Sequence, residues 1–442
     1  MLVVISDLHF QDTINDVIKD EQGNILVDVQ RNIFYEVFET TFEELRSLAR
    51  LNNAQELIIV LAGDIFDFNR SRQWFNYDVR PYDEYSSDKW GPIAVKIFDD
   101  IVESNRQTFD CFNKLLEISS NDVKIDFRYI PGNHDRIVNL YEPLQKRVRA
   151  LLGLNGEGCF EHEIVMEKYG VHIRHGHEYD PINFAGEIPR KGPFVVKNEE
   201  YDLAPLGDYV TIDFAARVAF EYRKRYEKDM KCGPDQDEYR LIYRKFLEFD
   251  DLRPLTAIKK FLESEMADKY MAWKFLLYFI FTMALPRALE SEFVCKKLGM
   301  VKFYLLRVFA VISPQLLINY LMRNQSTGQD SWYLPQRSYI QREPILQNAQ
   351  YQYLVSGHTH NPAIEYLRRR DDGKEEFFFD TGTWRRQISR CCDNSTFGRA
   401  KTLTYVAFYS SDEDLPRAGG NKGYSFDYWS GYNKREIAGE VF

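Results

Sequence analysis

The chain has 442 residues, of which 44% are hydrophobic, and it carries a formal net charge of −10. This length fits two domains or one domain with a large insertion, and the hydrophobic content is that of an ordinary packed soluble protein. The excess of acidic residues argues against a protein that binds nucleic acid without sequence specificity, because such binding depends on a basic surface. It does not exclude a local basic patch.

The number and spacing of the cysteines indicate the cellular compartment of the protein. The six cysteines show no zinc-binding spacing and include one adjacent pair: Cys111, Cys159, Cys232, Cys295, Cys391 and Cys392. Scattered cysteines of this kind predict free thiols in a reducing compartment. A strand-like apolar run starts at residue 2, which leaves no room for a cleaved apolar signal. We therefore expect a cytoplasmic protein.

Five short runs of β-branched and apolar residues are each followed closely by a polar motif. The runs span residues 2–5, 57–61, 127–130, 171–173 and 353–355. The motifs are Asp7-Leu8-His9, Gly63-Asp64, Gly132-Asn133-His134-Asp135, His175-Gly176-His177 and Gly357-His358-Thr359-His360, and they hold six of the eight histidines. Because such runs predict buried strands, the motifs are expected on loops at strand ends, where open sheets gather functional residues.

The segments between these strands predict helices and hairpins. Apolar residues at spacings of three and four predict a helix within 31–51 that covers one face of the sheet, and residues 93–119 show a similar pattern. Residues 11–30 predict a small hairpin, and the runs 363–367 and 375–379 predict another. A last strand at 403–409 is expected to close the second sheet. The fold class is therefore α/β, a two-sheet sandwich flanked by helices.

The motif residues offer the ligands that a divalent transition metal prefers. Imidazole, carboxylate and amide oxygen together suit Mn, Fe, Zn, Co or Ni, whereas an all-oxygen set would indicate Mg or Ca. The seven candidate ligands are Asp7, His9, Asp64, Asn133, His175, His358 and His360. One ion cannot use so many, so we expect two divalent ions, with Mn preferred, about 3.5 to 4 Å apart and sharing a bridging carboxylate. Such a pair indicates phosphoester hydrolysis by water.

The ordered set Asp-x-His, Gly-Asp, Gly-Asn-His-Asp, His-Gly-His and Gly-His-Thr-His resembles the calcineurin-like metallophosphoesterase superfamily. The resemblance covers about residues 1–180 and 350–410, and the segment 380–384 is similar to a superfamily turn near the metal loops. It implies that one ion is held by Asp7, His9 and His360. It implies that the other is held by Asn133, His175 and His358, with Asp64 as the bridge.

The resemblance also implies catalytic roles. His134 is expected beside the metals, where it stabilises the phosphoryl charge or protonates the leaving oxygen, and Asp135 is expected to hold its ring. His177 is interpreted as a support for a metal ligand or as a substrate phosphate contact. A loop histidine bonded to a backbone carbonyl is an equal alternative for His177. His162 and His172 lie outside the motifs and are assigned to structure.

A long segment separates the last two histidine motifs and is expected to choose the substrate. The predicted organisation is a catalytic domain at 1–182 and 351–410, an all-helical cap insertion at 183–350, and a C-terminal tail at 411–442. Within the cap, the apolar runs 275–285 and 300–322 are too short or too interrupted by charge to span a membrane. Seven Lys/Arg against two Glu between 271 and 323 predict contact with an anionic lipid or a membrane surface. A dimer interface or a buried helical core is the alternative.

A loop at 69–92 adds many aromatic residues directly after Asp64. They are Trp74, Phe75, Tyr77, Tyr82, Tyr85 and Trp90. These side chains could stack a base or line an acyl or sugar pocket, because aromatics bring a large area and a π face. The alternative is an ordered loop whose aromatics pack on the domain.

The leading hypothesis is a dinuclear metal-dependent phosphoesterase that hydrolyses a phosphomonoester, phosphodiester or pyrophosphate by attack of a metal-bridging hydroxide. Its substrate is expected to be a phosphorylated small molecule, nucleotide-linked or lipid-like. The UDP-diacylglucosamine pyrophosphohydrolases, a subgroup of the superfamily, also place a helical lid between the last two motifs. The lid is far longer here, and His134 stands where that subgroup commonly has arginine.

Two alternatives remain. A nuclease acting on DNA or RNA would need a basic groove beside the metals and a coiled-coil docking helix, and residues 411–442 show no heptads for one. A non-catalytic scaffold should have lost ligands or His134, which this chain retains.

Overall fold

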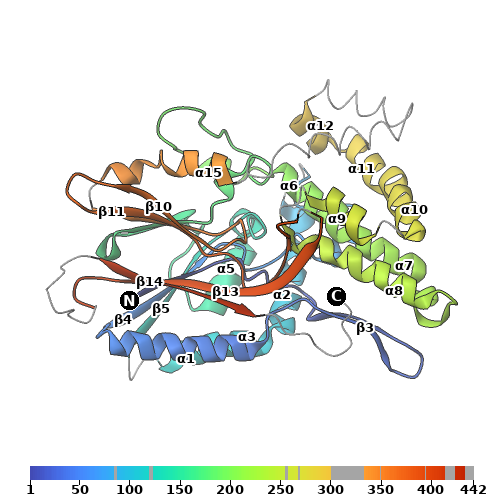
Figure 1. The fold of residues 1–442 in the computed structure, drawn as a ribbon, viewed down its shortest axis with the longest axis horizontal. Helices are drawn as coiled ribbons and strands as arrows, with labels where there is room; N and C mark the ends of the chain where they lie inside the picture. Colours follow the sequence, from blue (N-terminus) through green and yellow to red (C-terminus); the bar gives the residue numbers. More distant parts are fainter. Residues whose placement is uncertain are drawn as a thin grey trace.

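The computed structural model describes residues 1–83, 87–118, 123–253, 257–266, 269–299, 333–348, 350–393, 395–413 and 424–433. Two packed sheets lie between layers of helix, and a helical insertion stands at one end of them (Figure 1). The predicted two-sheet α/β sandwich is confirmed.

The first sheet carries three of the five motif-bearing strands. Its order is β5-β4-β1-β13-β12-β8, and β14 also pairs with β13. The bounds are β1 Leu2–Ile5, β4 Glu56–Ala62, β5 Lys124–Ile130, β8 Leu252–Arg253, β12 Arg386–Arg390, β13 Phe397–Tyr409 and β14 Ser425–Asn433. Strands β1, β4 and β5 are parallel, so their carboxyl ends meet at one edge. The loops after them must therefore come together there.

The second sheet carries the other two motif-bearing strands. Its order is β10-β11-β9-β7-β6, with β7, β9 and β11 parallel. The bounds are β6 Glu163–Met166, β7 Val171–Arg174, β9 Tyr353–Ser356, β10 Ala363–Arg369 and β11 Glu375–Asp380. The hairpin predicted at 363–379 is confirmed as β10 and β11.

Alternating side chains of the buried strands build two separate cores. In β1, Leu2 and Val4 point between the sheets, where they meet Ile173, Val355 and other apolar residues of the second sheet. Val3 and Ile5 point the other way, into a core closed by the outer helices. Those helices are α1 Tyr35–Leu51, α2 Ser87–Ser104, α3 Arg106–Ile118, α4 Ile137–Leu140 and α5 Glu142–Leu152. On the far side of the second sheet, Ile340 of α15 Tyr333–Ile340 packs on Leu354 and Phe378.

From Leu206 onward the described part of the insertion is mostly helical, whereas residues 183–205 form loops and turns and β8 adds a strand to the first sheet, so the insertion is not all-helical as expected. It holds α6 Leu206–Tyr209, α7 Arg217–Cys232, α8 Gln236–Leu247, α9 Ile258–Glu265, α10 Tyr270–Phe279, α11 Leu285–Glu290 and α12 Glu292–Leu298. π-Helical turns at Val210–Ala216 and Ile280–Ala284 join α6 to α7 and α10 to α11. Its core includes Tyr222, Phe246 and Phe275, and it continues onto Val27 and Ile388 of the catalytic domain. The insertion is thus packed on the catalytic domain through a shared core.

Two elements differ from the sequence expectations, and a third confirms them. The strand expected at 403–409 is part of β13 and lies in the first sheet, because it pairs with β1 rather than with the hairpin. The tail holds β14, which pairs with β13 along its length. The ribbon β2 Asn15–Lys19 and β3 Ile25–Gln30 confirms the hairpin predicted at 11–30, and it packs against the insertion.

The apolar run at 275–285 belongs to a longer helical stretch than expected. Among the described residues, Tyr270–Glu290 is the one helical stretch long and apolar enough to cross a membrane, and 28% of its most apolar window is buried. Core helices of soluble proteins pass the same test of length and composition. The second apolar run, 300–322, lies outside the described residues.

The aromatic loop mostly packs on the domain, as its alternative interpretation predicted. Trp74, Tyr82 and Trp90 are buried in the main core. Phe75 packs on Phe220 of α7 with ring centroids 5.0 Å apart. Tyr77 is 43% exposed, and Tyr85 lies outside the described residues. The loop therefore fastens the catalytic domain to the insertion.

Candidate metal centre

The five motif loops meet at one edge of the sandwich and have an unusual backbone. Asp7, His9, Asp64, His358 and His360 all have positive φ, between 47° and 71°. Residues other than glycine adopt this conformation rarely, and such local strain is typical of functional sites. Glycines are needed beside these residues, because a Cβ at Gly132 would overlap Asp64 and one at Gly357 would overlap Asp7.

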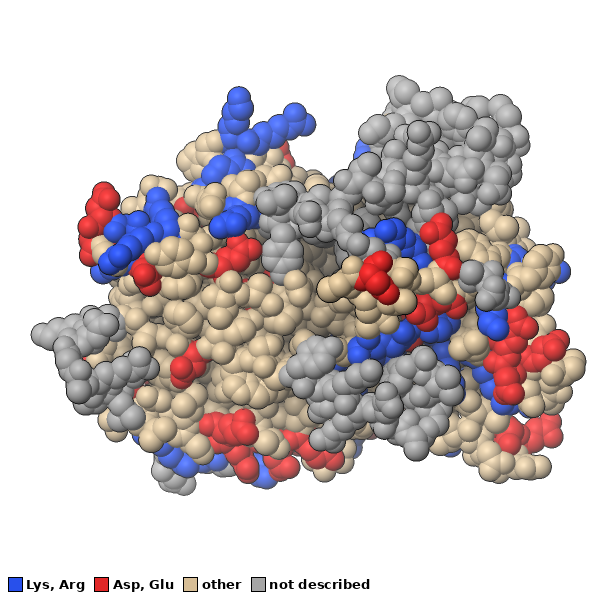
Figure 2. Space-filling view, in the orientation of Figure 1, with Lys and Arg blue, Asp and Glu red and all other residues tan. Residues whose placement is uncertain are grey.

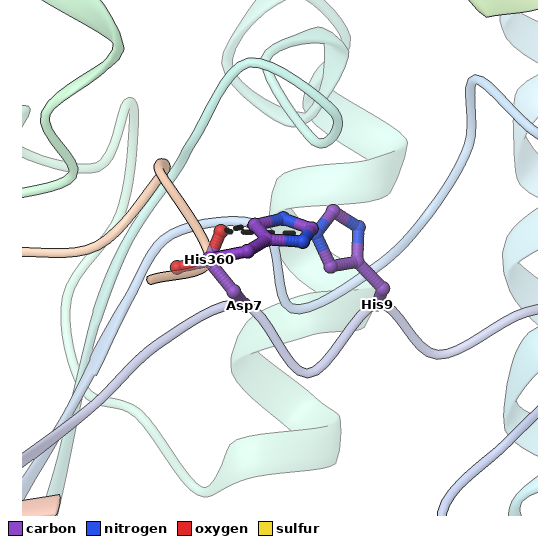
Figure 3. Close-up of side chains that lie close together, drawn as sticks. All are labelled: Asp7, His9 and His360. Carbon is purple, nitrogen blue, oxygen red and sulfur yellow. Dashed lines mark hydrogen bonds and ion pairs between the residues drawn. The ribbon is translucent and has the colours of Figure 1, made fainter. Parts of the chain in front are cut away.

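Asp7, His9 and His360 form the first group of ligand atoms (Figure 3). The Nε2 atoms of His9 and His360 lie 2.9 Å apart, and the His360 Nε2 lies 3.3 Å from Asp7 Oδ1. Asp7 Oδ1 is buried and accepts no hydrogen bond within the described part of the chain. Two facing ring nitrogens and an acceptor without a donor are what a bound cation would satisfy, so these residues fit a metal ion.

Asp64 lies between the two halves of the centre. Its Oδ2 lies 3.7 Å from His9 Nε2 and 3.4 Å from His175 Nε2. Its Oδ1 accepts a hydrogen bond of 2.7 Å from the backbone N–H of His134. One carboxylate oxygen is therefore anchored, while the other faces ligands of both groups.

His175, Asn133 and His358 surround the other side of Asp64. The Nδ1 of His175 lies 2.9 Å from the carbonyl oxygen of Ala62, which fixes its proton there and leaves Nε2 to bind a cation. Asn133 Oδ1 lies 3.3 Å from that Nε2. His358 Nε2 lies 3.1 Å from Asp180 Oδ2, which leaves Nδ1 of His358 as its ligand atom. The donors again suit a transition metal.

The ring of His134 is held by Asp67, not by Asp135, so the expected pairing is wrong. His134 Nδ1 lies 2.8 Å from Asp67 Oδ1. Asp135 instead accepts hydrogen bonds from the backbone N–H groups of Ile65, Phe66 and Gly132. Both side chains reach the loop after Asp64, but Asp135 binds backbone N–H groups there and the His134 imidazole binds the Asp67 side chain. Asp135 therefore joins two motif loops and has no contact with the reacting side of His134 in the structure.

Asp67 is the main site residue that the sequence interpretation missed. It accepts from His134 and from Arg70 Nη1 at 2.9 Å, and its Oδ2 lies 3.1 Å from His9 Nδ1. Burial would raise its pKa, but the charges of Arg70 and His134 hold that pKa well below its usual range. The one available signal was its position three residues after Asp64. Asp67 thus orients a metal ligand and the candidate catalytic histidine together.

Asp180 and Asp380 are further buried carboxylates beside the last motif. Asp180 holds the His358 ring, as described above. Asp380 accepts a 2.6 Å hydrogen bond from Thr359 and one of 2.9 Å from the N–H of Gly382. The neighbouring Thr383 donates to the carbonyl of Asp7 at 2.7 Å, so the segment 380–384 does contact the metal loops.

His177 lies beside the centre in an aromatic setting. Its ring centroid is 5.3 Å from that of His175, and its ring makes T-shaped contacts with the rings of Phe184 and Tyr201. Burial, followed by the charge of His175, lowers its pKa well below the usual range. Its Nδ1 has no hydrogen-bond partner among the described residues, so the backbone-carbonyl alternative does not hold at that atom. A substrate phosphate contact stays a prediction.

The two histidines assigned to structure lie away from these groups. His172 Nε2 pairs with Glu163 at 2.9 Å, and the His162 ring stacks on Tyr201 with centroids 4.0 Å apart. All seven predicted ligands and His134 are brought together at one edge of the sandwich.

Comparison with known proteins supports the same identity. The model of the calcineurin-like phosphoesterase family matches residues 1–230, which include the first four motifs. No curated protein matches the chain. The last motif lies beyond the matched residues, yet His360 completes the first group of ligands and His358 completes another. The chain therefore belongs to the calcineurin-like phosphoesterase family and is a metal-dependent phosphoric ester hydrolase.

Proposed function

We propose that the protein binds two divalent ions, with Mn preferred, and hydrolyses a small phosphorylated substrate chosen by the helical insertion. One observation carries this proposal. The three groups of ligand atoms overlap, since His9 belongs to two of them and Asp64 to two. Overlap through a buried carboxylate is the arrangement that a shared two-metal centre requires.

The ligand sets follow from the contacts. Asp7, His9 and His360 would hold one ion, Asn133, His175 and His358 would hold the other, and Asp64 would contact both. Two bound ions would supply Lewis-acid polarisation of the phosphoryl oxygens and a water of lowered pKa. The buried carboxylates Asp67 and Asp180 fix the rings of His9 and His358, so the ligands are preorganised.

His134 is proposed as the proton donor to the leaving oxygen. Asp67 holds Nδ1 of its ring, and its backbone N–H is bound to Asp64. Nε2 remains to donate to a phosphoryl or leaving-group oxygen. The ring is edge-on to His9 at 4.7 Å between centroids, which keeps it beside the first ligand group. No covalent intermediate with a side chain is needed.

The insertion supports a nucleotide-linked or lipid-like substrate. Its stretch Tyr270–Glu290 is apolar and only partly buried, with Tyr270 74% exposed and Tyr278 38% exposed. Lys274 and Arg287 lie on the same stretch. An apolar surface with basic residues suits an amphiphilic phosphate or the surface of an anionic membrane.

The six cysteines are all unpaired, which supports the proposed cytoplasmic location.

A nuclease is the less favoured candidate. Figure 2 shows Lys/Arg and Asp/Glu side chains interspersed over the described part of one face, where a nuclease would need a continuous basic band. Hydrolysis of single-stranded DNA, and of no other substrate, would be the evidence for a nuclease.

The test is hydrolysis by the Mn-loaded protein across a panel of p-nitrophenyl phosphate, bis-p-nitrophenyl phosphate, a UDP-linked acyl sugar and single-stranded DNA. Asp64→Ala should lose bound metal and all hydrolysis together, because it removes the ligand shared by both groups. Asp99→Asn is the matched control, since Asp99 is 55% exposed and pairs with Arg147 on the surface. An Asp64→Ala variant that keeps both ions and its activity would overturn the proposal. Activity confined to DNA would favour the nuclease.

A further inference from the structure

Two helices of the insertion, α7 and α10, lie side by side at the end of the molecule away from β4 and β5 (Figure 1). Their inner faces pack together, since the Phe275 ring of α10 meets the Tyr222 ring of α7 with centroids 4.9 Å apart. Their outer faces also join, because the Arg225 guanidinium of α7 stacks on the Tyr278 ring of α10, 4.4 Å from its centroid. The two helices therefore present one continuous outer surface.

The outer side of α7 is basic. Lys224, Arg225 and Lys228 lie on one side of the helix, opposite the buried Tyr222, and all three are exposed. Other basic residues of α7 take its glutamates, in the pairs Arg217–Glu221, Arg223–Glu227 and Lys231–Glu227. Among the residues that the structure describes, the three outer cations have no carboxylate partner. Their charges are therefore available to an anionic partner.

The outer side of α10 adds an apolar and aromatic stripe. Tyr270, Lys274, Leu277, Tyr278 and Phe281 recur at helical spacing, on the side opposite the buried residues of the helix. Tyr270 is 74% exposed and Tyr278 is 38% exposed, while Leu277 and Phe281 are half-buried. Lys274 is exposed and, like the outer cations of α7, has no carboxylate partner within the described ranges.

The inner side of α10 keeps the helix on the protein. Phe275, Leu276 and Phe279 are buried in the core of the insertion. Beyond the π-helical turn that follows, Arg287 donates to Asp83 of the catalytic domain at 2.9 Å. The helix could cross a bilayer only by giving up these contacts. A helix with one face in a protein core and a basic, apolar face outside is instead suited to lie in the plane of a membrane surface.

We propose that the outer surface of α7 and α10 docks the protein on an anionic bilayer. This docking surface consists of Lys224, Arg225, Lys228, Tyr270, Lys274 and Tyr278. Cations without carboxylate partners match anionic headgroups in charge, and tyrosine rings suit the headgroup level of a membrane. The chain as a whole carries a net charge of −10, so only a local gathering of cations gives it an attractive face. The inference goes beyond the proposed function, because docking does not depend on the metal centre.

The test is sedimentation of the full chain with two kinds of vesicle, phosphatidylcholine alone and phosphatidylcholine mixed equally with phosphatidylglycerol. The wild type should bind the mixed vesicles about tenfold or more tightly than the neutral ones, and added salt should weaken that binding. The triple variant Lys224→Gln, Arg225→Gln, Lys228→Gln should bind the mixed vesicles about a hundredfold more weakly. Each basic residue near an anionic surface contributes about fivefold.

The matched control removes the same charge from the surface of the catalytic domain. Its substitutions are Lys114→Gln, Lys124→Gln and Lys146→Gln, at exposed lysines that pair with Glu39, Glu56 and Glu142. This control should bind the mixed vesicles within about twofold of the wild type, since its changes lie outside the docking surface. Tyr270→Ser tests the apolar part and should weaken binding by about fivefold. Far-UV circular dichroism checks that every variant is folded.

Two results would overturn the proposal. Equal losses in the two triple variants would show that net charge, and not this surface, governs binding. Equal affinity of the wild type for both kinds of vesicle would show that anionic headgroups are not recognised.

Sedimentation velocity tests a second copy of the chain as the occupant. A wild-type dimer that becomes monomeric in the Lys224→Gln, Arg225→Gln, Lys228→Gln variant would assign the surface to a subunit interface, and membrane docking would be wrong. Hydrolysis of p-nitrophenyl phosphate by the same samples separates the two proposals. Vesicle binding without hydrolysis would refute the proposed function alone, and hydrolysis without vesicle binding would refute docking alone.

Discussion

In the loops around Asp64, backbone N–H groups and ring nitrogens hold each carboxylate in place, whereas the core of the insertion is mostly aromatic and aliphatic. Asp64 and Asp135 each accept from backbone N–H groups of a neighbouring loop. In the insertion, Tyr222, Phe246 and Phe275 make edge-to-face and tilted contacts. Short local motifs therefore specify the chemistry, while the insertion has no comparable local signature in the sequence.

The two regions are joined by a few buried ion pairs. Asp208 of α6 accepts from Arg136 and from Asn69, which follow His134 and Asp64 on the two central loops. Asp213, also of the insertion, pairs with Arg80 of the aromatic loop at 2.9 Å. These contacts couple the insertion to the loops of the metal centre, and variants of the residues involved test how far the two regions act independently.

The largest effect is expected from Asp67→Ala, which removes the residue shared by His9, His134 and Arg70. The buried guanidinium of Arg70 would lose its 2.9 Å contact with Asp67, and removing one member of a buried ion pair should lower the free energy of unfolding by about 3 to 5 kcal/mol. Turnover should fall by about a hundredfold or more because the His134 ring is released. Chemical denaturation and steady-state kinetics measure both. Retention of normal turnover would show that His134 is held by something else.

His134→Ala should separate catalysis from metal binding. We expect turnover to fall by about a hundredfold or more with both ions retained, since His134 is proposed to act on the substrate and not on the metals. Metal analysis beside p-nitrophenyl phosphate hydrolysis gives the two readouts. Loss of both ions would make His134 a ligand, because its ring nitrogen does lie within the group formed with His9 and Asp64.

Asp208→Asn should test the contact between the insertion and the loops of the metal centre. The amide keeps the shape and can still bind Asn69, but it loses the charge opposite Arg136, so about 2 kcal/mol of stability should be lost. The metal content should stay normal, and kcat/KM for the natural class of substrate should fall more than that for p-nitrophenyl phosphate. Equal losses for both substrates would mean that the insertion does not act through this contact.

His162 lies where the catalytic domain meets the insertion, and His162→Phe should have the smallest effect on stability of the variants considered. Burial lowers the pKa of His162 to about 4, so the folded protein keeps this ring neutral, whereas an unfolded histidine titrates near about 6.5. As pH falls below about 6.5, only the unfolded chain gains this proton. The free energy of unfolding should therefore fall by at most about 1.4 kcal/mol per pH unit until about pH 4.

Urea denaturation of the wild type and His162→Phe at about pH 7 and about pH 5 measures how much His162 contributes to the loss of stability in acid. The variant should lose less stability between the two pH values than the wild type. Equal losses would show that other groups cause the acid sensitivity. Tyr201 stays in place as the stacking partner in both proteins.

The ligand residues could be predicted from sequence because each motif directly follows a short buried strand. Parallel neighbours β1, β4 and β5 then bring Asp7, Asp64 and Asn133 to the same edge without any further information. Asp67 could not be assigned in the same way. Its partners His9 and His134 lie on other loops, and only the folded chain shows that Asp67, rather than the adjacent Asp135, faces the His134 ring.

Strand pairing was harder to predict than strand position. The run 403–409 was recognised as a strand, but its placement beside β1 depends on a long-range contact. The Arg385 environment is similar, because Asp67 and Asp251 come from distant segments of the chain. Nothing in the local sequence around residue 385 indicates that this guanidinium is buried.

Anomalous diffraction from crystals of the Mn-loaded protein tests the two-metal centre most directly. We expect two peaks about 3.5 to 4 Å apart, one among Asp7, His9 and His360 and one among Asn133, His175 and His358, with Asp64 contacting both. A single peak, or a second ion held without Asp64, would contradict the shared centre on which the proposed function rests.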